Sequence, residues 1–242
     1  MPTLSPSRVK RATNLNQGVP LAPSWHTATL VAVILAVALI GTLLTRQGIA
    51  VPTAVASNSR IASRYLPMIV VEWSLLLYVC RVGRPRSALR ALLGRGWMPH
   101  VRAGADIALG LCGWLLIKAV ELAWMRLLPA GVIASVSATL PVTWVERIAW
   151  GFVAASVGFC EEVVFRGYLQ AQLTACTRRA SAALVLQAVL FALAHGEQGG
   201  MAMVRIALYW LALAALARWK QSLLPGIICH VLSDLASGWL PR

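Results

Sequence analysis

Two adjacent carboxylates and an arginine stand inside an otherwise apolar run in the second half of the chain. Glu162 precedes Arg166 by four residues, so on a helix the two side chains share a face and can neutralise each other. Glu161 is five residues from Arg166, about 140° around the helix, which leaves its carboxylate free to face a cavity. Ionisable groups at membrane depth are costly and therefore indicate a functional site. A purely structural ion-pair cluster is the alternative for these three residues taken alone.

Two later segments of the chain each carry a histidine, His195 and His230. Glu161 and His195 are equally far along the chain from Arg178, which lies in a basic turn between two apolar runs. Antiparallel helices joined at that turn would bring the two side chains to a similar depth. His230 and Asp234 are four residues apart, so on a helix they share one face. The sequence therefore predicts that two histidines and up to three carboxylates converge from three helices.

This set of side chains suits hydrolysis of an amide or ester without a nucleophilic side chain. A carboxylate and a histidine can share the deprotonation of water, while a second histidine donates a hydrogen bond to the developing oxyanion. A serine hydrolase is disfavoured because the sequence has no G-x-S-x-G motif. We expect no cofactor. Zinc is the alternative, because two histidines and a carboxylate are a catalytic zinc ligand set, although no H-E-x-x-H motif occurs.

The amino-acid composition indicates that these residues lie in membrane-spanning helices. The chain has 242 residues, of which 59% are hydrophobic and 12% charged, whereas a soluble domain has about 25% charged residues. Its apolar runs are long enough to cross a hydrocarbon core of about 30 Å as helices. We predict an all-α, polytopic transmembrane helix bundle with about seven spanning helices. Their approximate ranges are 26–44, 65–82, 105–127, 145–172, 181–195, 201–217 and 223–240.

The predicted domain organisation has three parts. Residues 1–24 form a disordered basic tail, residues 25–144 form N-terminal transmembrane helices with a basic cytoplasmic connection near 83–104, and residues 145–242 form a catalytic helical core. The net charge of +14 does not indicate nucleic-acid binding, because the basic residues lie mostly between apolar runs, where they contact anionic headgroups. Most connecting Lys and Arg residues lie on the side of the N-terminus, which is therefore expected to be cytoplasmic.

Other charged residues in the apolar runs have structural interpretations. Lys118 and Glu121 can pair at a spacing of three residues. Glu72 and Arg205 are expected either to neutralise each other or to line the cavity. We predict no catalytic role for these four residues.

The order of the three polar motifs resembles a known family. The pattern E-E-x-x-x-R is present from Glu161 to Arg166, F-x-x-x-H from Phe191 to His195, and H-x-x-x-D from His230 to Asp234. Over residues 145–240 the chain is similar to the CPBP family of intramembrane proteases, also called the Abi family. That family includes type II CAAX prenyl endopeptidases and bacteriocin-processing or immunity proteins. The resemblance implies a glutamate-type protease.

The resemblance also implies a role for each matched residue. Glu161 and His195 would activate water, and His230 and Asp234 would form the oxyanion side. Asp234 departs from the asparagine of well-studied prenyl endopeptidases, so it must either be protonated by burial or orient His230. Three further residues would support the site: Glu162, Arg166 and Phe191.

We therefore expect an intramembrane endopeptidase that acts on a membrane-anchored protein or peptide within the lipid bilayer. A zinc-dependent metalloendopeptidase on the same residues and a non-catalytic bacteriocin immunity or interaction protein are the alternatives. A transporter is disfavoured because the sequence shows no inverted repeat. The expected location is a bacterial inner (cell) membrane, as an integral multi-pass protein.

Overall fold

The computed structural model describes residues 20–46, 60–82, 92–94, 103–127 and 139–239. Within these ranges the chain is helical and forms no strand. The α-helices are α2 (Ser24–Arg46), α4 (Leu66–Val82), α6 (Ala103–Leu127), α8 (Trp144–Glu161), α9 (Gln170–Thr177), α10 (Ala180–Leu193), α11 (Gly200–Lys220) and α12 (Leu224–Trp239). A π-helical segment, η1 (Ile61–Tyr65), leads directly into α4, and a second, η4 (Glu162–Leu169), joins α8 to α9. A short 3₁₀ helix, η5 (Gly196–Gln198), follows α10.

Each of the seven predicted ranges coincides with a helical stretch, so the prediction of an all-α polytopic bundle is confirmed. Five stretches are long and apolar enough to cross a membrane: Ser24–Arg46, Ile61–Arg81, Ala103–Trp124, Trp144–Thr177 and Gly200–Lys220. The helices α10 and α12 have 14 and 16 residues, which is shorter than the usual span of about 20 residues. The protein is an integral multi-pass membrane protein.

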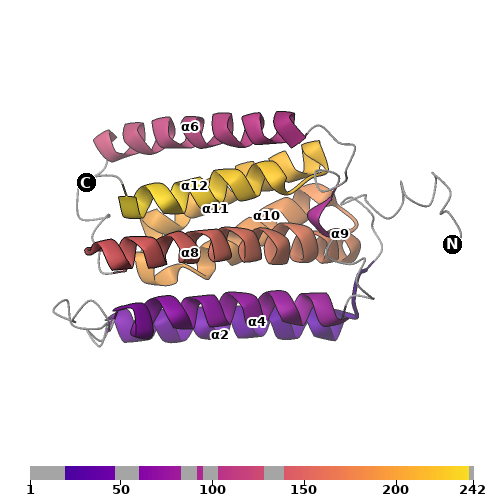
Figure 1. Cartoon of the computed structure of the whole chain (residues 1–242). Helices are drawn as coiled ribbons and strands as arrows, with labels where there is room; N and C mark the ends of the chain where they lie inside the picture. Colours follow the sequence, from indigo (N-terminus) through magenta and orange to yellow (C-terminus); the bar gives the residue numbers. More distant parts are fainter. Residues whose placement is uncertain (1–19, 47–59, 83–91, 95–102, 128–138, 240–242) are drawn as a thin grey trace, which may run out of the picture.

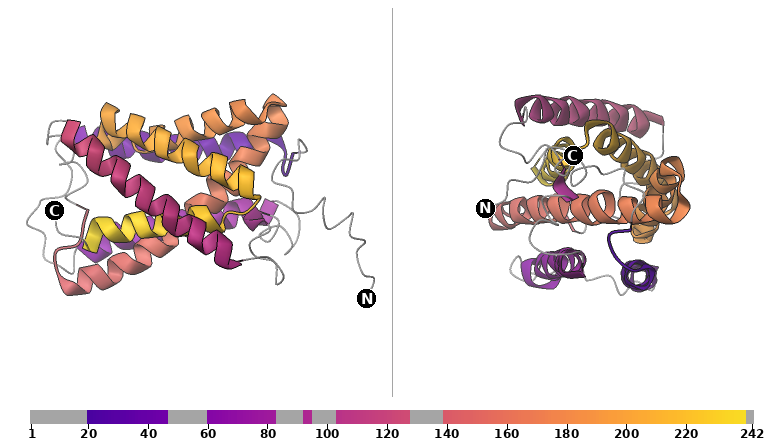
Figure 2. Two further views of the ribbon diagram at one scale, coloured as in Figure 1. Left: turned by 90° about the horizontal axis from the view of Figure 1, so that it is seen from above. Right: turned by 90° about the vertical axis from the view of Figure 1, so that its right-hand side faces the viewer.

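The long stretch formed by α8, η4 and α9 runs through the middle of the bundle (Figures 1 and 2). Helices α2 and α4 lie on one side of α8, and α12 packs against the other side. Helix α6 covers the outer face of α12, while α10 and α11 run side by side in opposite directions. The centre of the stretch, where the paired carboxylates lie, is therefore surrounded by other helices.

Local sequence signals set the ends of this central stretch. The Thr143 hydroxyl accepts a hydrogen bond from the Glu146 backbone N–H, and the Glu146 carboxylate accepts one from the Thr143 backbone N–H, which is a capping box. Arg60 pairs with the same carboxylate at 2.9 Å, which ties the start of α8 to the residue before η1. At the other end, Arg178 adopts a left-handed conformation (φ 55°) and ends α9.

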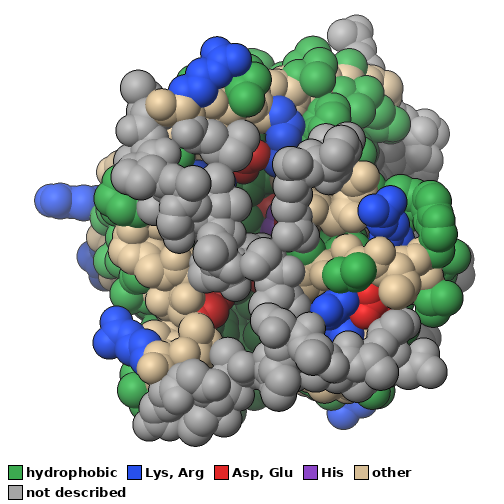
Figure 3. Space-filling view, turned by 90° about the vertical axis from the view of Figure 1, so that its left-hand side faces the viewer, with side chains coloured by type: hydrophobic (Ala, Val, Ile, Leu, Met, Phe, Trp, Pro, Cys, Tyr) green, Lys and Arg blue, Asp and Glu red, His purple; other side chains and the backbone are tan. Residues whose placement is uncertain are grey.

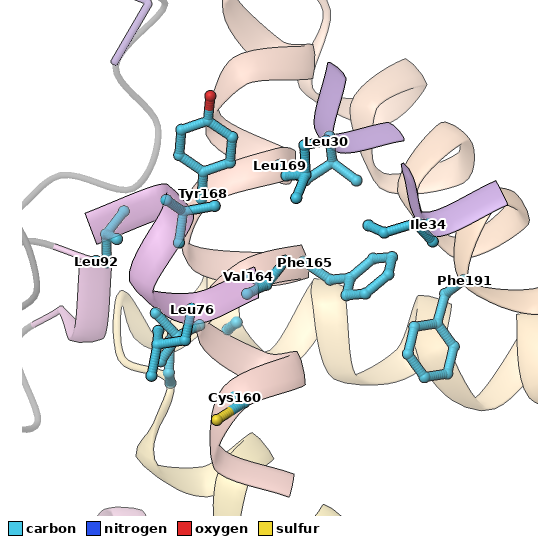
Figure 4. Close-up of a cluster of buried hydrophobic side chains, with 14 of the residues drawn as sticks. Leu30, Ile34, Leu76, Leu92, Cys160, Val164, Phe165, Tyr168, Leu169 and Phe191 are labelled. Carbon is cyan, nitrogen blue, oxygen red and sulfur yellow. The ribbon is translucent and has the colours of Figure 1, made fainter. Parts of the chain in front are cut away.

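The apolar core gathers around the π-helical segment (Figure 4). Val164, Phe165 and Leu169 of η4 are buried. The ring of Phe165 meets the ring of Phe191 edge-to-face, with the centroids 4.8 Å apart. Helices α2 and α4 contribute Leu30, Ile34 and Leu76 to the same cluster. Burial of these side chains is about 1.5–3 kcal/mol favourable for each one, so the cluster holds η4 firmly in place.

Tyr168, also in η4, connects the apolar core to a buried polar cluster. Its hydroxyl lies 2.6 Å from His26 Nδ1 and 3.1 Å from the Thr27 hydroxyl. The side-chain amide of Gln172 donates to the Thr27 hydroxyl at 2.6 Å and to the Ala22 carbonyl at 2.9 Å. The start of α2 is thereby bound to η4 and α9.

Two parts of the predicted domain organisation lie largely outside the described residues. These are the N-terminal tail, of which residues 1–19 are not described, and the basic connection near 83–104, of which only residues 92–94 and 103–104 are described. Leu92 and Leu93 are buried, and the Leu93 carbonyl accepts a hydrogen bond from the Leu223 backbone N–H at 3.0 Å. The division into a tail, N-terminal helices and a catalytic core stays a prediction.

Candidate active site

The buried ion pair expected between Glu162 and Arg166 is present. Both side chains are fully buried, and the Arg166 guanidinium also lies over the ring of Trp210, 3.5 Å from its centroid. The two residues lie in η4, where backbone hydrogen bonding follows a π-helical pattern instead of an α-helical one. Single π-helical turns within α-helices frequently occur at functional sites.

His230 lies at the centre of the carboxylates. Its Nε2 atom is 3.5 Å from Glu161 Oε2 and 3.5 Å from Asp234 Oδ2, and its Nδ1 atom is 3.5 Å from Glu162 Oε1. These separations exceed the 2.7–3.2 Å that is usual for N–H···O hydrogen bonds. Catalytic contacts are often long without substrate and tighten when it binds. The structure therefore brings Glu161, His230 and Asp234 together.

Close packing of α12 against α8 and η4 brings His230 to this position. At Gly158 an added Cβ would lie 2.6 Å from Val231 Cγ2, and at Gly226 it would lie 2.7 Å from Glu162 Oε2. The Trp150 indole N–H donates to the Asp234 backbone carbonyl at 2.7 Å, which links α8 to α12 a turn further on. Two glycines thus allow the close approach of the backbones that carry the carboxylates and the histidine.

His195 lies just past the end of α10 instead of within the predicted helix 181–195, because α10 ends at Leu193. Its Nδ1 is 2.9 Å from the Phe191 carbonyl. A carbonyl oxygen only accepts hydrogen bonds, so Nδ1 carries the proton, and in the neutral ring the lone pair would then be on Nε2. The ring also packs on Phe191, with centroids 4.5 Å apart.

His195 interacts electrostatically with His230 and Asp234, and so lies on the same side of the bundle. Within the part of the chain that the structure describes, no direct ion pair joins it to Glu161. Glu161 and His195 were expected to lie at a similar depth, but in the described residues they form no ion pair with each other. The histidine that approaches Glu161 most closely in these ranges is His230.

Glu72 was assigned no catalytic role from the sequence, yet it belongs to the same group of charges. This α4 residue interacts electrostatically with His230, Asp234 and Glu161. Among the described residues Arg205 forms no ion pair with Glu72. It lies 3.9 Å from Glu121, which also binds Lys118 at 2.6 Å as predicted. The sequence could have indicated this position of Glu72, because it is a single carboxylate within an apolar helix.

Trp210 is another residue of the site that the motifs do not include. It is fully buried and contacts Arg166, Phe191 and His230. The position of Trp210 in the site could not be predicted from the sequence, because an aromatic residue in an apolar helix does not by itself indicate a functional site.

Figure 3 views the bundle from one end, where acidic and histidine side chains are visible near hydrophobic ones. Glu161 is 8% exposed and His230 is 5% exposed. These values fit a recessed site that admits small molecules such as water. Among the described residues, no group of three or more His, Cys, Asp or Glu side chains is arranged to hold a metal ion.

Comparison with known protein families gives a match that covers all seven predicted site residues. Residues 143–236 match the model of a family described as type II CAAX prenyl endopeptidase Rce1-like. Residues 143–236 are similar to this family, and the match is called the Rce1-like segment below. The resemblance inferred from the three motifs is thus confirmed, and the Rce1-like segment corresponds to α8 through most of α12. No curated protein and no solved structure matches the chain.

The Rce1-like match supports a CAAX-type intramembrane protease in general terms. The segment contains the carboxylates and histidines described above, whereas Glu72 lies outside it. The candidate active site is therefore composed of the matched segment and one carboxylate from the N-terminal helices.

Proposed function

We propose that the protein is an intramembrane endopeptidase that hydrolyses a peptide bond of a membrane-associated protein or peptide. The observation that carries the proposal is the position of Glu161. This carboxylate is recessed and lies 3.5 Å from His230, and among the described residues no ion pair joins it to an arginine. Glu162 neutralises Arg166, so Glu161 remains available as a general base.

In the proposed reaction, the Glu161 carboxylate removes a proton from a water molecule as the water oxygen attacks the carbonyl carbon of the peptide. The unprotonated Nε2 of His195 accepts a hydrogen bond from this water and orients it. A carbon–oxygen bond forms, and the carbonyl oxygen becomes an oxyanion. When the carbon–nitrogen bond breaks, protonated Glu161 returns its proton to the leaving amine.

The oxyanion is stabilised by a hydrogen bond donated from His230, whose ring is held between Glu161 and Asp234 at 3.5 Å. An ionised Asp234 cannot donate to the oxyanion, so its role is to orient His230 and to stabilise positive charge on its ring. Stabilisation by one such donor contributes roughly a hundredfold or more to the rate.

The substrate class follows from the family description only in part. A prenylated peptide of the CAAX type is the first substrate to test. A non-prenylated peptide with one membrane-spanning segment is the second. Both reach the site from within or beside the bilayer.

The experiment compares purified wild-type protein with Glu161→Ala in vesicles that contain either peptide, with cleavage followed by mass spectrometry. Wild-type protein should cleave at least one peptide, and Glu161→Ala should reduce kcat by about 100-fold or more. Asp106→Asn is the matched control, because Asp106 pairs with Lys220 at 3.4 Å and takes no part in the site. Undiminished cleavage by Glu161→Ala would refute the proposal.

A further inference from the structure

The indole ring of Trp210 contacts one residue of each of the three motifs. The Arg166 guanidinium carbon lies 3.5 Å from the ring centroid, and the ring of Phe191 is stacked at 3.3 Å and 11°. The ring of His230 stands at 90° to it, with centroids 4.8 Å apart. Trp210 is 1% exposed. No motif includes Trp210, although it lies where the three motifs meet.

The geometry assigns a partner to both faces of the ring. Two groups cannot both lie about 3.5 Å from one centroid on the same face, so Arg166 and Phe191 occupy opposite faces. The ring of His230 is perpendicular to the indole plane and, because both faces are occupied, lies at the edge of the indole. A cation over an indole face is a favourable arrangement, and the Phe191 ring lies face-to-face on the opposite side of the indole.

The stack continues to the second histidine. Phe191 packs on His195 at 4.5 Å, and its backbone carbonyl holds His195 Nδ1 at 2.9 Å. One column therefore runs from the buried ion pair through Trp210 and Phe191 to His195. Displacement of Trp210 would shift the arginine that pairs with Glu162, the oxyanion histidine and, through Phe191, the water-orienting histidine.

We propose that Trp210 is a positioning residue that fixes the relative placement of Arg166, His195 and His230 in the hydrolytic reaction. The inference rests on the proposed function. Because Trp210 is 1% exposed, it acts through these neighbouring residues. An aliphatic side chain would fill much of the same space but would offer no ring face to Arg166 and Phe191, so the proposal differs from simple core packing.

The test compares Trp210→Phe, which keeps a ring, with Trp210→Leu, which does not, in the vesicle assay. Trp210→Leu should lower kcat by about 100-fold with little change in KM, because small displacements of catalytic groups have effects of this size. Trp210→Phe should lose no more than about tenfold, because phenylalanine also offers a face to a cation and a stack. Trp219→Leu on the same helix, where Trp219 is 72% exposed, is the control and should leave kcat unchanged.

A double-mutant cycle with Phe191→Leu separates positioning from general loss of packing. If Trp210 acts through Phe191, the double variant should lose clearly less kcat than the product of the fold losses in Trp210→Phe and Phe191→Leu. Independent, multiplicative losses would overturn the inference. The cycle uses only the conservative variant of Trp210, so it decides the question even where Trp210→Leu does not fold in detergent.

Two other results would also overturn it: an unchanged kcat in folded Trp210→Leu, or equal losses in the phenylalanine and leucine variants. A wild-type protein that cleaves neither peptide would refute the proposed function, and this inference with it. A wild-type protein that cleaves, with Trp210 variants that behave like Trp219→Leu, would refute the inference alone.

Discussion

Gly158 is the position where a single added methyl group should disable the site without touching any catalytic side chain. An added Cβ at this residue would lie 2.6 Å from Val231 Cγ2, 3.1 Å from the Val231 nitrogen and 3.2 Å from its Cα. The favourable separation between carbon atoms is about 3.5–4.0 Å, so the closest contact is too short by about 1 Å. Valine is stiff at χ1 in a helix, and the two backbone contacts do not depend on its rotamer. Relief therefore requires α8 and α12 to move apart.

The consequence for the site follows from its location. Val231 is the residue after His230, and Gly158 is one turn before Glu161, so separation of the helices acts directly on the 3.5 Å contact between Glu161 and His230. A displacement of about 1 Å can reduce the rate of an enzyme by about 100-fold. Overpacking of this kind costs about 1–3 kcal/mol of stability, which a folded bundle can tolerate. Gly158→Ala should therefore remain folded and lose about 100-fold in kcat.

The assay is cleavage of the membrane-anchored peptides in vesicles, together with thermal unfolding in detergent followed by circular dichroism. Gly151→Ala is the matched control on the same helix, because its added Cβ would lie 4.0 Å from Leu235 Cδ2, an ordinary contact. Gly151→Ala should retain wild-type kcat. If folded Gly158→Ala cleaved as fast as Gly151→Ala, the argument that close helix packing sets the distance between Glu161 and His230 would be wrong.

Three further predictions concern charge and metal. Glu162→Gln leaves the buried Arg166 without its carboxylate partner, which should lower the free energy of unfolding in detergent by about 3–5 kcal/mol. A free energy of unfolding equal to that of the wild type would contradict this prediction. Glu72→Gln removes a carboxylate that interacts with His230; loss of its support for positive charge on the His230 ring, about 1–2 kcal/mol at an effective dielectric constant near 20, should lower kcat by up to about tenfold. An unchanged kcat, as expected of the Asp106→Asn control, would exclude this role. Treatment with a strong zinc chelator should leave cleavage intact under the proposed glutamate mechanism, whereas loss of cleavage that added zinc restores would favour the metalloendopeptidase alternative.

The helices and the local pairs of the site could be predicted from the sequence because they depend on short-range spacing. Apolar runs bounded by polar residues predict helices that match the observed ones closely. A spacing of four residues places Glu162 beside Arg166, and His230 beside Asp234, whatever the rest of the chain does. The end of α10 at Leu193, two residues before His195, was not predicted. An apolar run has no strong signal for where its last helical turn opens.

The contacts between helices could not be predicted in the same way. The argument that two antiparallel helices bring Glu161 and His195 to one depth uses distance along the helix, and it says nothing about rotation around the helix axis. Rotation is set by the close approach at Gly158 and by the π-helical segment that follows Glu161. Both depend on packing against distant helices, and as a result the direct neighbour of Glu161 is His230.

The N-terminal helices, which lie outside the Rce1-like match, complete the environment in which this chemistry could work. Helices α2 and α4 supply Leu30, Ile34 and Leu76 to the apolar cluster around η4. Helix α6 covers α12 so closely that an added Cβ at Gly110 would lie 2.8 Å from Ile228 Cβ. Burial of Glu161 and Glu162 strengthens the charge interactions that these two carboxylates make. Because α4 also brings Glu72 toward His230, we infer that these helices tune the electrostatics of the site as well as enclose it.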